Sequence, residues 1–461
     1  MHSFFKLPFY PLLPDDPNLS LQRGRIHEFF KYTKPHRKLL EQIELVIIDE
    51  ISMVRADLID AIDRILRVYS HNLREPFGGK QLLLVGDVFQ LEPVVKNDER
   101  EILNRAYPTP YFFSARVFSQ IDLVSIELQK VYRQTDSVFV SVLDHIRTNT
   151  AGAADLQLLN TRYGSHIEES EADMYITLAT RRDTVDSINE KKLAELAGEP
   201  ITFEGSIEGD FPESSLPTSQ ELVLKPGAQI IFIKNDFDRR WVNGTIGVIA
   251  GIDEEEETIY VITDDGKECD VKRESWRNIR YRYNEKTKEI EEEVLGSFTQ
   301  YPIRLAWAIT VHKSQGLTFS RVVIDFTGGV FAGGQAYVAL SRCTSLDGIQ
   351  LKKPINRADI FVRPEIVNFA GRFNDRQAID KALKQAQADV QYAAAARAFD
   401  KGDMEECLEQ FFRAIHSRYD IEKPVPRRLI RRKLGIINTL QEQNKKLKEQ
   451  MREQQERLRQ Y

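Results

Sequence analysis

Two carboxylates follow a short apolar run near the start of the chain. Asp49 and Glu50 come directly after Leu45-Val46-Ile47-Ile48, and such a run is typical of a buried parallel strand. At the end of a strand, Asp49 can hold Mg²⁺ through its water shell, while Glu50 orients or deprotonates a water that attacks a phosphate. Because acidic pairs also end strands by chance, the pair alone is a weak signal of nucleotide hydrolysis.

A second apolar run adds polar groups that the same crevice can use. Leu82 to Val85 leads into the segment from Gly86 to Val94, which reads Gly-Asp-Val-Phe-Gln-Leu-Glu-Pro-Val. Gly86 permits a tight turn, and Gln90 can sense a γ-phosphate or the attacking water. Since ligands of open α/β sheets bind beyond the carboxyl ends of the strands, both runs predict one shared site.

The elements that position these groups alternate between strand and helix. Between the two runs, apolar residues recur at helical spacing from Val54 to Tyr69, and Pro76-Phe77-Gly78-Gly79 breaks the pattern. Further apolar runs at 123–128 and 175–180 predict additional strands. The alternation predicts an α/β fold with mostly parallel sheets.

The middle of the chain differs from the first part in composition and in its pattern of apolar residues. Residues 205–220 are poor in large apolar side chains and indicate a linker. Residues 222–279 alternate short β-rich runs with the turn pairs Asn243-Gly244 and Asp265-Gly266, which predicts a small inserted β-barrel. The acidic run Asp253–Glu257 is expected to be a solvated hairpin tip.

The C-terminal part reads as helical and then basic. Residues 373–419 predict two packed helices, with a break at 400–403. From Lys423 to Tyr461 there are twelve Lys or Arg against four Glu, although the whole chain carries a net charge of −6. Ile437, Leu440, Asn444, Leu447, Met451, Gln454 and Leu458 alternate by three and four. This spacing predicts either a coiled coil that joins two copies through 437–458 or a solvated charged helix.

The composition is that of a folded protein with several domains. At 461 residues the chain exceeds what one core normally fills, and 42% apolar with 29% charged residues argues against global disorder. We find neither a membrane-spanning apolar stretch nor a secretion signal, so we expect a cytoplasmic protein without a membrane partner. Cys269, Cys343 and Cys407 lie far apart, which gives no support to a disulfide framework or a zinc site.

Five segments in order give a specific resemblance. Asp49-Glu50-Ile51-Ser52-Met53, Gly86 to Val94, Leu128 to Gln134, Ala308 to Thr318 and Tyr337 to Arg342 resemble motifs II, III, IV, V and VI of the Pif/RecD-like branch of superfamily 1 DNA helicases. Short motifs occur singly by chance, whereas an ordered set rarely does. The resemblance covers about residues 1–352 and implies two RecA-like P-loop NTPase domains.

The resemblance also implies bounds for the parts of the chain. The domains expected are an incomplete first RecA-like domain at 1–136, which holds a wedge loop at 8–18, a second RecA-like domain at 137–221 and 298–363, the inserted small β-barrel at 222–297, a helical extension at 364–423 and a basic coiled-coil tail at 424–461.

Residue roles follow from the same resemblance. Arg133 and Arg342 match two arginine fingers that reach the γ-phosphate of ATP from the second domain, and Gly316 lies in a nucleotide-contacting segment. A guanidinium spreads positive charge over the transferring phosphoryl group, so hydrolysis becomes sensitive to domain closure. A surface ion pair is the plainer alternative for either arginine.

DNA contacts are implied at two places. His312, Lys313, Ser314 and the backbone at Gly316 are expected along a single strand, where phosphate contacts give affinity without reading bases. His2, Ser3 and Phe4 resemble the segment just ahead of the duplex-splitting wedge. Whether Trp241 stacks on a base or packs in the barrel is left open by its sequence context, and packing is favoured.

A phosphate-binding loop is not found in the sequence. Such a loop reads G-x-x-x-x-G-K-[ST], but Gly-Lys occurs only at Gly79-Lys80 and Gly266-Lys267, followed by Gln81 and Glu268. In the family this loop precedes the His-Ser-Phe-Phe segment, so we expect it upstream of Met1, and we expect this chain alone to hydrolyse ATP poorly. The first sheet should then expose an edge and apolar surface.

The sequence thus supports two functions. The first is a helicase that uses ATP and Mg²⁺ to move along single-stranded DNA, acting at forks or duplex junctions in DNA repair, recombination or telomere-type maintenance. The alternative is a non-hydrolysing DNA-binding or scaffolding protein derived from a helicase. DNA binding without ATP turnover would select the second.

Overall fold

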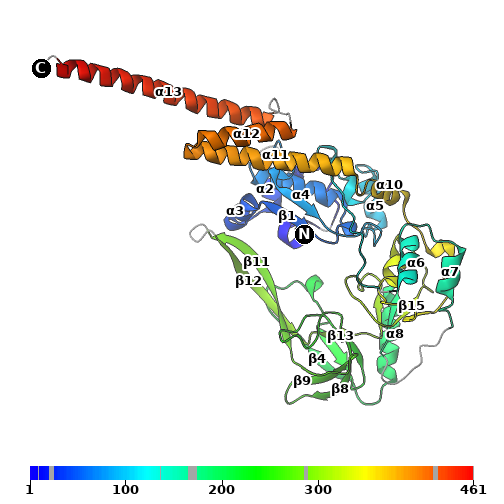
Figure 1. Cartoon of the computed structure of the whole chain (residues 1–461). Coiled ribbons are helices and arrows are strands. Elements are labelled where there is room, and N and C mark those ends of the chain that lie inside the picture. Colours follow the sequence, from blue (N-terminus) through cyan, green and yellow to red (C-terminus); the bar gives the residue numbers. More distant parts are fainter. Residues whose placement is uncertain are drawn as a thin grey trace. The chain divides into compact units, whose positions relative to one another are not determined.

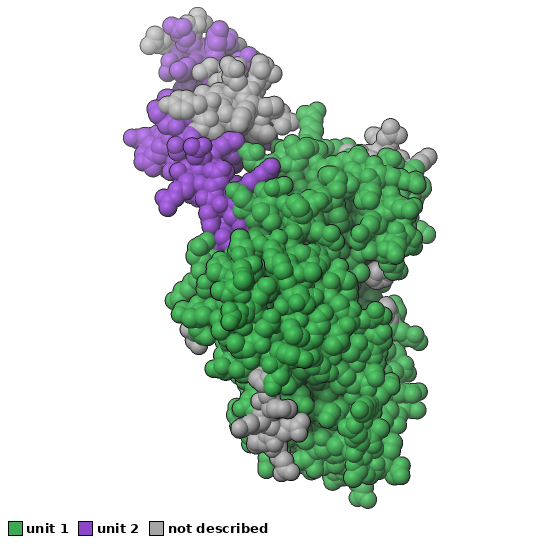
Figure 2. Space-filling view, turned by 90° about the vertical axis from the view of Figure 1, so that its right-hand side faces the viewer, with its two compact units in different colours: residues 1–123, 128–371 green, residues 124–127, 372–461 purple. Residues whose placement is uncertain are grey.

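The computed structural model describes residues 1–8, 10–19, 25–134, 136–164, 174–284, 289–418 and 424–459 (Figure 1). The chain divides into two compact units (Figure 2). The larger unit comprises residues 1–123 and 128–371, and the smaller comprises residues 124–127 and 372–461. The larger unit holds all of the predicted motif residues.

The first lobe of the larger unit is built on helix α4 (Ala56–Tyr69). The helix connects the parallel strands β1 (Leu45–Ile48) and β2 (Gln81–Leu84). Its apolar side chains recur at helical spacing, and Ile59, Ile62 and Ile65 are fully buried in the core. The other helices of this lobe are α1 (His2–Phe5), α2 (Arg25–Phe30), α3 (Lys34–Gln42) and α5 (Asn97–Asn104).

The β1–β2 sheet is covered on one face. Val46, Ile48, Leu82 and Leu84 pack on the core beneath it. Leu45, Ile47, Leu83 and Val85 alternate with them and are exposed. The strands were predicted as buried, and within the described residues only half of their side chains are. The second face of this sheet is therefore apolar and exposed.

The second lobe holds a larger parallel sheet. In the described residues its strand order is β14 (Ala308–Thr310), β3 (Ile176–Ala179), β15 (Val322–Asp325) and β16 (Ile349–Leu351). The helices that accompany it are α6 (Ser137–Arg147), α7 (Ala153–Asn160), α8 (Arg182–Glu195) and α9 (Gln335–Leu340). The α/β prediction is therefore confirmed. A strand predicted at 123–128 was wrong, because this segment has no regular structure and its Leu128 side chain is exposed.

An antiparallel region is inserted between β3 and β14. Its main sheet has the order β10 (Glu268–Val271), β9 (Thr258–Thr263), β8 (Ile246–Asp253), β7 (Gln229–Phe232) and β13 (Ile303–Leu305). Two further groups pair β4 (Ile201–Glu204) with β6 (Glu221–Leu224), and β11 (Glu274–Asn284) with β12 (Glu289–Gln300) and β5 (Ser206–Gly209).

This region is wider than the range predicted for it. It runs from β4 to β13 and so extends beyond 222–297 at both ends. The segment interpreted as a linker contributes β5, and β6 begins directly after it. Residues 254–257 form the exposed turn between β8 and β9, as expected of an acidic hairpin tip.

The smaller unit is helical. Helices α11 (Arg376–Lys401) and α12 (Met404–Arg418) pack through Ala388, Tyr392 and Ala414, with the predicted break at Gly402. Helix α13 (Pro424–Arg459) spans the predicted coiled-coil segment. Helix α10 (Pro364–Ala370) lies in the larger unit, so the helical extension begins later than residue 364. Within the described ranges, no helix is both long and apolar enough to cross a bilayer.

Candidate active site

The acidic pair and the second polar loop lie in backbone contact. Ile51 N donates to Val85 O at 3.0 Å, directly after Glu50 and directly before Gly86. Gly86 has φ 153°, and a Cβ at this position would lie 2.9 Å from Ile51 N. Only glycine allows this approach without displacement of one loop. Glu50 itself has φ 51°, an uncommon conformation that is often found at functional sites.

The electrostatics distinguish the two carboxylates. Asp49 is exposed and Glu50 is half-buried. Burial raises the pKa of Glu50, and the neighbouring carboxylates Asp49 and Asp87 raise this pKa further, while Arg342 opposes them. A carboxylate with a raised pKa accepts a proton more readily near neutral pH, which suits a general base. Arg342 belongs to the second lobe, so this charge coupling links the lobes.

Arg342 is held inside the second lobe by its own hydrogen bonds. The side chain is 1% exposed. Its Nη1 donates to Leu317 O at 3.2 Å and to Ser314 O at 3.4 Å, both in the motif V segment. Its Nε donates to Val338 O at 3.1 Å and its Nη2 to Ser341 Oγ at 3.1 Å. The guanidinium therefore joins motif V to motif VI.

Four residues of the predicted motifs, Glu50, Asp87, Arg133 and Arg342, lie close enough for their charges to interact. Burial and the Arg133 guanidinium lower the pKa of Arg342 to about 10, against the opposing effect of Glu50 and Asp87. Arg133 Nη1 lies 3.5 Å from Ser341 O, the carbonyl that precedes Arg342. Repulsion between two such cations is relieved when an anion lies between them. The geometry thus suits a polyphosphate.

Gln134 is a positioning residue that the sequence analysis missed. Its Nε2 donates to Ser341 O at 2.9 Å and to Cys343 O at 3.0 Å. The side chain is buried, and these bonds fix the backbone beside Arg133 against motif VI. The only signal in the sequence was a polar residue next to the arginine in motif IV, which does not distinguish a structural contact from a functional one.

Motif III forms the contact between the lobes. Gln90 is half-buried on this loop, and the next residue, Leu91, is fully buried in the core of the second lobe. Gly334, at the start of α9, has φ 76°, and a Cβ there would lie 2.3 Å from both Phe89 O and Gln90 O. The two backbones approach so closely that a side chain at position 334 would separate them.

Glu92 extends the same interface with polar contacts. Its carboxylate accepts the Tyr111 hydroxyl at 2.7 Å within the first lobe. From the second lobe, Gly333 N donates to this carboxylate at 3.4 Å, and Arg363 Nε lies 3.4 Å from it. The sequence analysis assigned no role to Glu92, because these partners are distant along the chain.

The predicted DNA-contacting residues of motif V differ in accessibility. Lys313 and Gly316 are exposed, and His312 is half-buried. Ser314 is fully buried, and its hydroxyl donates to Val311 O at 2.8 Å. A DNA contact at Ser314 would therefore have to come from its backbone. Burial lowers the pKa of Lys313, and the cations Arg304 and Arg182 lower it further, so positive charge gathers beside Lys313.

The N-terminal candidates lie on α1. The His2 Nδ1 and Leu7 O atoms are 3.1 Å apart. The Phe4 ring packs edge-on to Phe5, with 4.9 Å between centroids, and on the buried His36 ring at 5.4 Å. The backbone of Ser3 belongs to the same helix, while its side chain lies outside the described residues. Phe4 is half-buried and contributes to the first-lobe core.

Trp241 packs inside the inserted region. The side chain is buried, and its ring stacks on Phe232 with 4.4 Å between centroids. Arg240 covers the indole at 4.6 Å. Trp241 therefore packs in the inserted region, as favoured from the sequence.

The side chains suit the metal and γ-phosphate side of an ATP site but leave the phosphate cradle unsupplied. Asp49 and Glu50 offer the hard oxygens that Mg²⁺ prefers. Among the described residues, no cluster of three or more His, Cys, Asp or Glu could hold a metal. Lys80 is not a phosphate-binding lysine, because its Nζ donates to Glu41 O and Ile43 O.

These features define the class of the protein. Two lobes with parallel sheets, carboxylates at the strand ends of one and arginines in the other, are the architecture of an ATP-driven helicase motor. The chain belongs to the PIF1-like helicase family, whose model matches residues 1–151. This confirms the resemblance seen in the motifs.

Named relatives agree. The ATP-dependent DNA helicase Pif1 of Campylobacter jejuni is 33% identical over 365 residues, which cover 76% of this chain and 78% of that protein. Human ATP-dependent DNA helicase PIF1 is 35% identical over 312 residues, 66% of this chain but only 45% of that protein. This chain thus spans less than half of the human relative.

Solved structures are also similar. Bacteroides sp Pif1 in complex with ADP-AlF4 matches with a TM-score of 0.71 and 39% identity, over 80% of this chain and 82% of that chain. Pif1 helicase from Candida albicans matches with a TM-score of 0.60 and 27% identity, over 80% and 84%. The chain is therefore an ATP-dependent DNA helicase by family, and ATP with Mg²⁺ is the fuel of that family.

Proposed function

We propose that the acidic pair and the two arginines form a hydrolysis site split between the lobes. Asp49 would hold Mg²⁺, Glu50 would accept a proton from the attacking water, and Gln90 would orient that water. Bound Mg²⁺ supplies positive charge to the phosphate oxygens. The observation that carries the proposal is the close approach of the motif III loop of the first lobe to Gly334 of the second lobe, where a Cβ would lie 2.3 Å from Phe89 O and Gln90 O, eight residues before Arg342.

Arg342 of the second lobe and Arg133, on the segment that leads into that lobe, complete this site. Their mutual repulsion in a buried setting makes an anionic ligand favourable between them. Because Arg342 also bonds the carbonyls of Ser314 and Leu317, movement of its guanidinium toward a nucleotide would release motif V. ATP use would in this way alter the segment proposed to contact DNA.

For DNA we propose a single strand that runs along motif V. Exposed Lys313 and the backbone at Gly316 would meet phosphates, with Arg304 and Arg182 adding charge nearby. A Bacteroides Pif1 has been solved bound to ssDNA, and another similar structure concerns DNA unwinding at forked dsDNA by two coordinating Pif1 helicases. We propose forks and duplex junctions as substrates here too, with 8–18 as the wedge and His2, Ser3 and Phe4 beside it.

The test uses the full-length protein. Glu50→Gln and Arg342→Lys should each reduce DNA-stimulated ATP hydrolysis by about a hundredfold or more, since each removes a group that acts on the reacting phosphate. Arg376→Lys, the same chemical change at an exposed residue of the smaller unit, is the control. Normal turnover of both site variants would contradict the proposal, and DNA binding without turnover in the wild type would favour the scaffolding alternative.

We further propose that α13 pairs with a second copy through 437–458. Leu440, Leu447 and Met451 are exposed along one seam of the helix, and Asn444 lies at the seam position where a polar side chain fixes the register of two strands. Replacing Leu440 and Leu447 with Lys should convert a dimer to a monomer in sedimentation. A monomeric wild type would show a solvated helix instead. We also propose that the protein acts in the cytoplasm.

A further inference from the structure

Helix α4 carries three carboxylates inside the protein. Asp57, Asp60 and Asp63 recur every three residues and are all buried. Buried carboxylates need strong hydrogen-bonding partners, because an unpaired charge in the interior is costly. Each of these three receives backbone N–H groups from a different loop.

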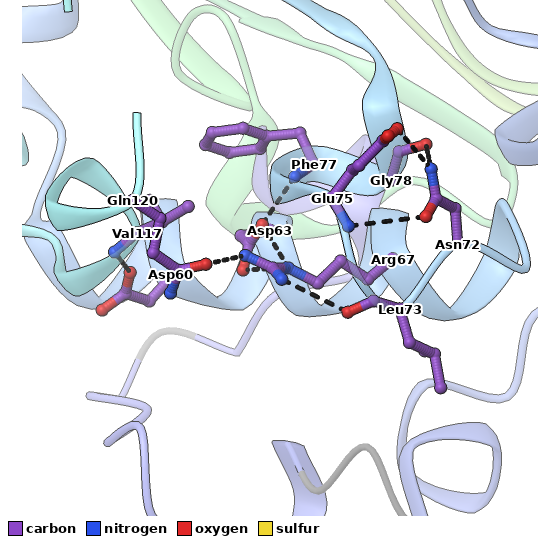
Figure 3. A network of polar contacts seen from close by, with 10 residues as sticks. All are labelled: Asp60, Asp63, Arg67, Asn72, Leu73, Glu75, Phe77, Gly78, Val117 and Gln120. Atoms are coloured by element: carbon purple, nitrogen blue, oxygen red, sulfur yellow. Dashed lines mark hydrogen bonds and ion pairs between the residues drawn. The ribbon is translucent and has the colours of Figure 1, made fainter. Parts of the chain in front are cut away.

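Two of the carboxylates fix loops of the first lobe (Figure 3). Asp60 accepts from the backbone N–H groups of Arg116 and Val117, both at 3.0 Å. Asp63 accepts from Phe77 N at 2.6 Å and from Arg67 Nε at 2.9 Å. In both cases a charge-assisted bond ties a loop to the rigid helix.

Asp57 performs the same task for the N-terminal segment. Its Oδ2 accepts Leu12 N at 3.1 Å. Arg55 pairs with the same carboxylate through Nε at 3.0 Å and Nη2 at 2.9 Å, and its Nη1 lies 3.4 Å from Glu99. Asp57 and Leu12 are both 0% exposed, so water does not compete for this bond.

Leu12 lies in the middle of the segment proposed as the wedge. Tyr10 on one side is exposed, and Leu19, which follows the segment, is again buried. Between them, Asp16 N donates to Leu13 O at 3.0 Å and Leu19 N donates to Asp16 O at 2.9 Å. The segment is thus attached at Leu12 and Leu19, and between them the partly buried Leu13 is followed only by polar residues and prolines.

We propose that Asp57 is the positioning residue of the strand-separating segment 8–18. This inference rests on the proposed wedge function. The helix that bears Asp57 begins six residues after Glu50, so one rigid element sets the position of both the hydrolysis site and the wedge. A wedge that moves independently of the motor would let the duplex close behind it, and ATP would be consumed without strand separation.

The matched pair of variants is Asp57→Asn and Asp63→Asn. Both remove a buried charge paired with an arginine and weaken one loop N–H contact, but only the first acts on the wedge. In the full-length protein, Asp57→Asn should speed amide exchange at Leu12 and reduce fork unwinding per ATP by about tenfold. Its ssDNA-stimulated ATPase should stay within about twofold of wild type, and Asp63→Asn should instead speed exchange at Phe77.

Each outcome decides the proposal. Unchanged exchange at Leu12, or normal unwinding per ATP in Asp57→Asn, would overturn it while leaving the motor intact. An equal loss of unwinding in Asp63→Asn would overturn it too, since general loosening of the lobe would then suffice. A wild type that hydrolyses ATP but separates no fork would contradict the proposed function first, and the wedge anchor with it.

A second variant covers the case in which Asp57→Asn does not fold. Arg55→Lys keeps the carboxylate and the charge but loses the two-pronged contact. In this variant, fork unwinding per ATP should fall by about two- to fivefold, while ssDNA-stimulated ATPase stays close to that of wild type. Arg55→Lys protein with normal unwinding and unchanged exchange at Leu12 would count against the proposal.

Discussion

Glu92 and Arg363 form an ion pair between the two lobes, with 3.4 Å between Oε2 and Nε. The same carboxylate accepts the Tyr111 hydroxyl of the first lobe, so its position is fixed from that side. Glu92 follows Gln90 by two residues on the motif III loop. Lobe movement that breaks this pair would therefore be transmitted to the loop that faces the proposed nucleotide.

Loss of the Glu92 charge should weaken the coupling between the lobes. Glu92→Gln leaves the shape but removes the attraction to Arg363, and we expect a two- to tenfold fall in DNA-stimulated kcat, because partly exposed pairs contribute only about 1 kcal/mol. Steady-state kinetics with Glu101→Gln, an exposed residue of α5, as control would measure this. Equal kcat values for the two variants would show that the pair is dispensable.

Arg342 should affect DNA binding even without nucleotide. Arg342→Ala removes the guanidinium that donates to the carbonyls of Ser314 and Leu317, and a disordered motif V should lower ssDNA affinity by about tenfold. Arg133→Ala should reduce ATP hydrolysis but leave this affinity unchanged. Fluorescence anisotropy of labelled ssDNA without nucleotide compares the two, and identical affinities would argue against the structural role of Arg342.

Gly86 should resist substitution. An added Cβ would meet Ile51 N at 2.9 Å, and φ 153° is unfavourable for other residues, so Gly86→Ala should destabilise the first lobe by about 1–3 kcal/mol. Thermal unfolding gives the value. Gly251→Ala is the control, because its Cβ would meet only Tyr260 at 3.9 Å. Equal melting temperatures for the two variants would contradict the close approach.

The pH dependence of hydrolysis should report on Glu50. As a base Glu50 must be ionised, so activity falls as the pH drops through its pKa, which burial and the neighbouring carboxylates raise above 4.5. Asp87→Asn removes one of these neighbours and should move the acidic limb of the pH–rate profile to lower pH. A limb that stays in place or moves upward would exclude Glu50 as the titrating group.

The 461-residue chain by itself should turn over ATP poorly. Its sequence contains no G-x-x-x-x-G-K-[ST] segment to cradle the phosphates. A DNA-stimulated phosphate-release assay on this chain should give a rate near background. The measurement needs no variant, and normal turnover would refute the prediction outright.

Local patterns in the sequence were sufficient for the fold class and for naming candidate site residues. The apolar run 45–48, the helical spacing up to Tyr69 and the coiled-coil spacing in α13 reflect periodicities of strand and helix that neighbouring residues establish. The strand predicted at 123–128 does not form, because the apolar residues there have no neighbouring strand to pair with among the described residues. The spacing of apolar residues along the chain does not show whether a second strand lies beside them.

The sequence by itself determined which chemical groups the protein has and in which order, from Asp49 and Glu50 to Arg342. Only the tertiary structure decided how they are held: Glu92 against Arg363, Asp57 on the Leu12 amide, and the Ser314 hydroxyl turned inward. The reason is physical. Secondary structure follows from interactions within a few residues, whereas these contacts join residues 45 or more positions apart or depend on which side chain the core has room to bury.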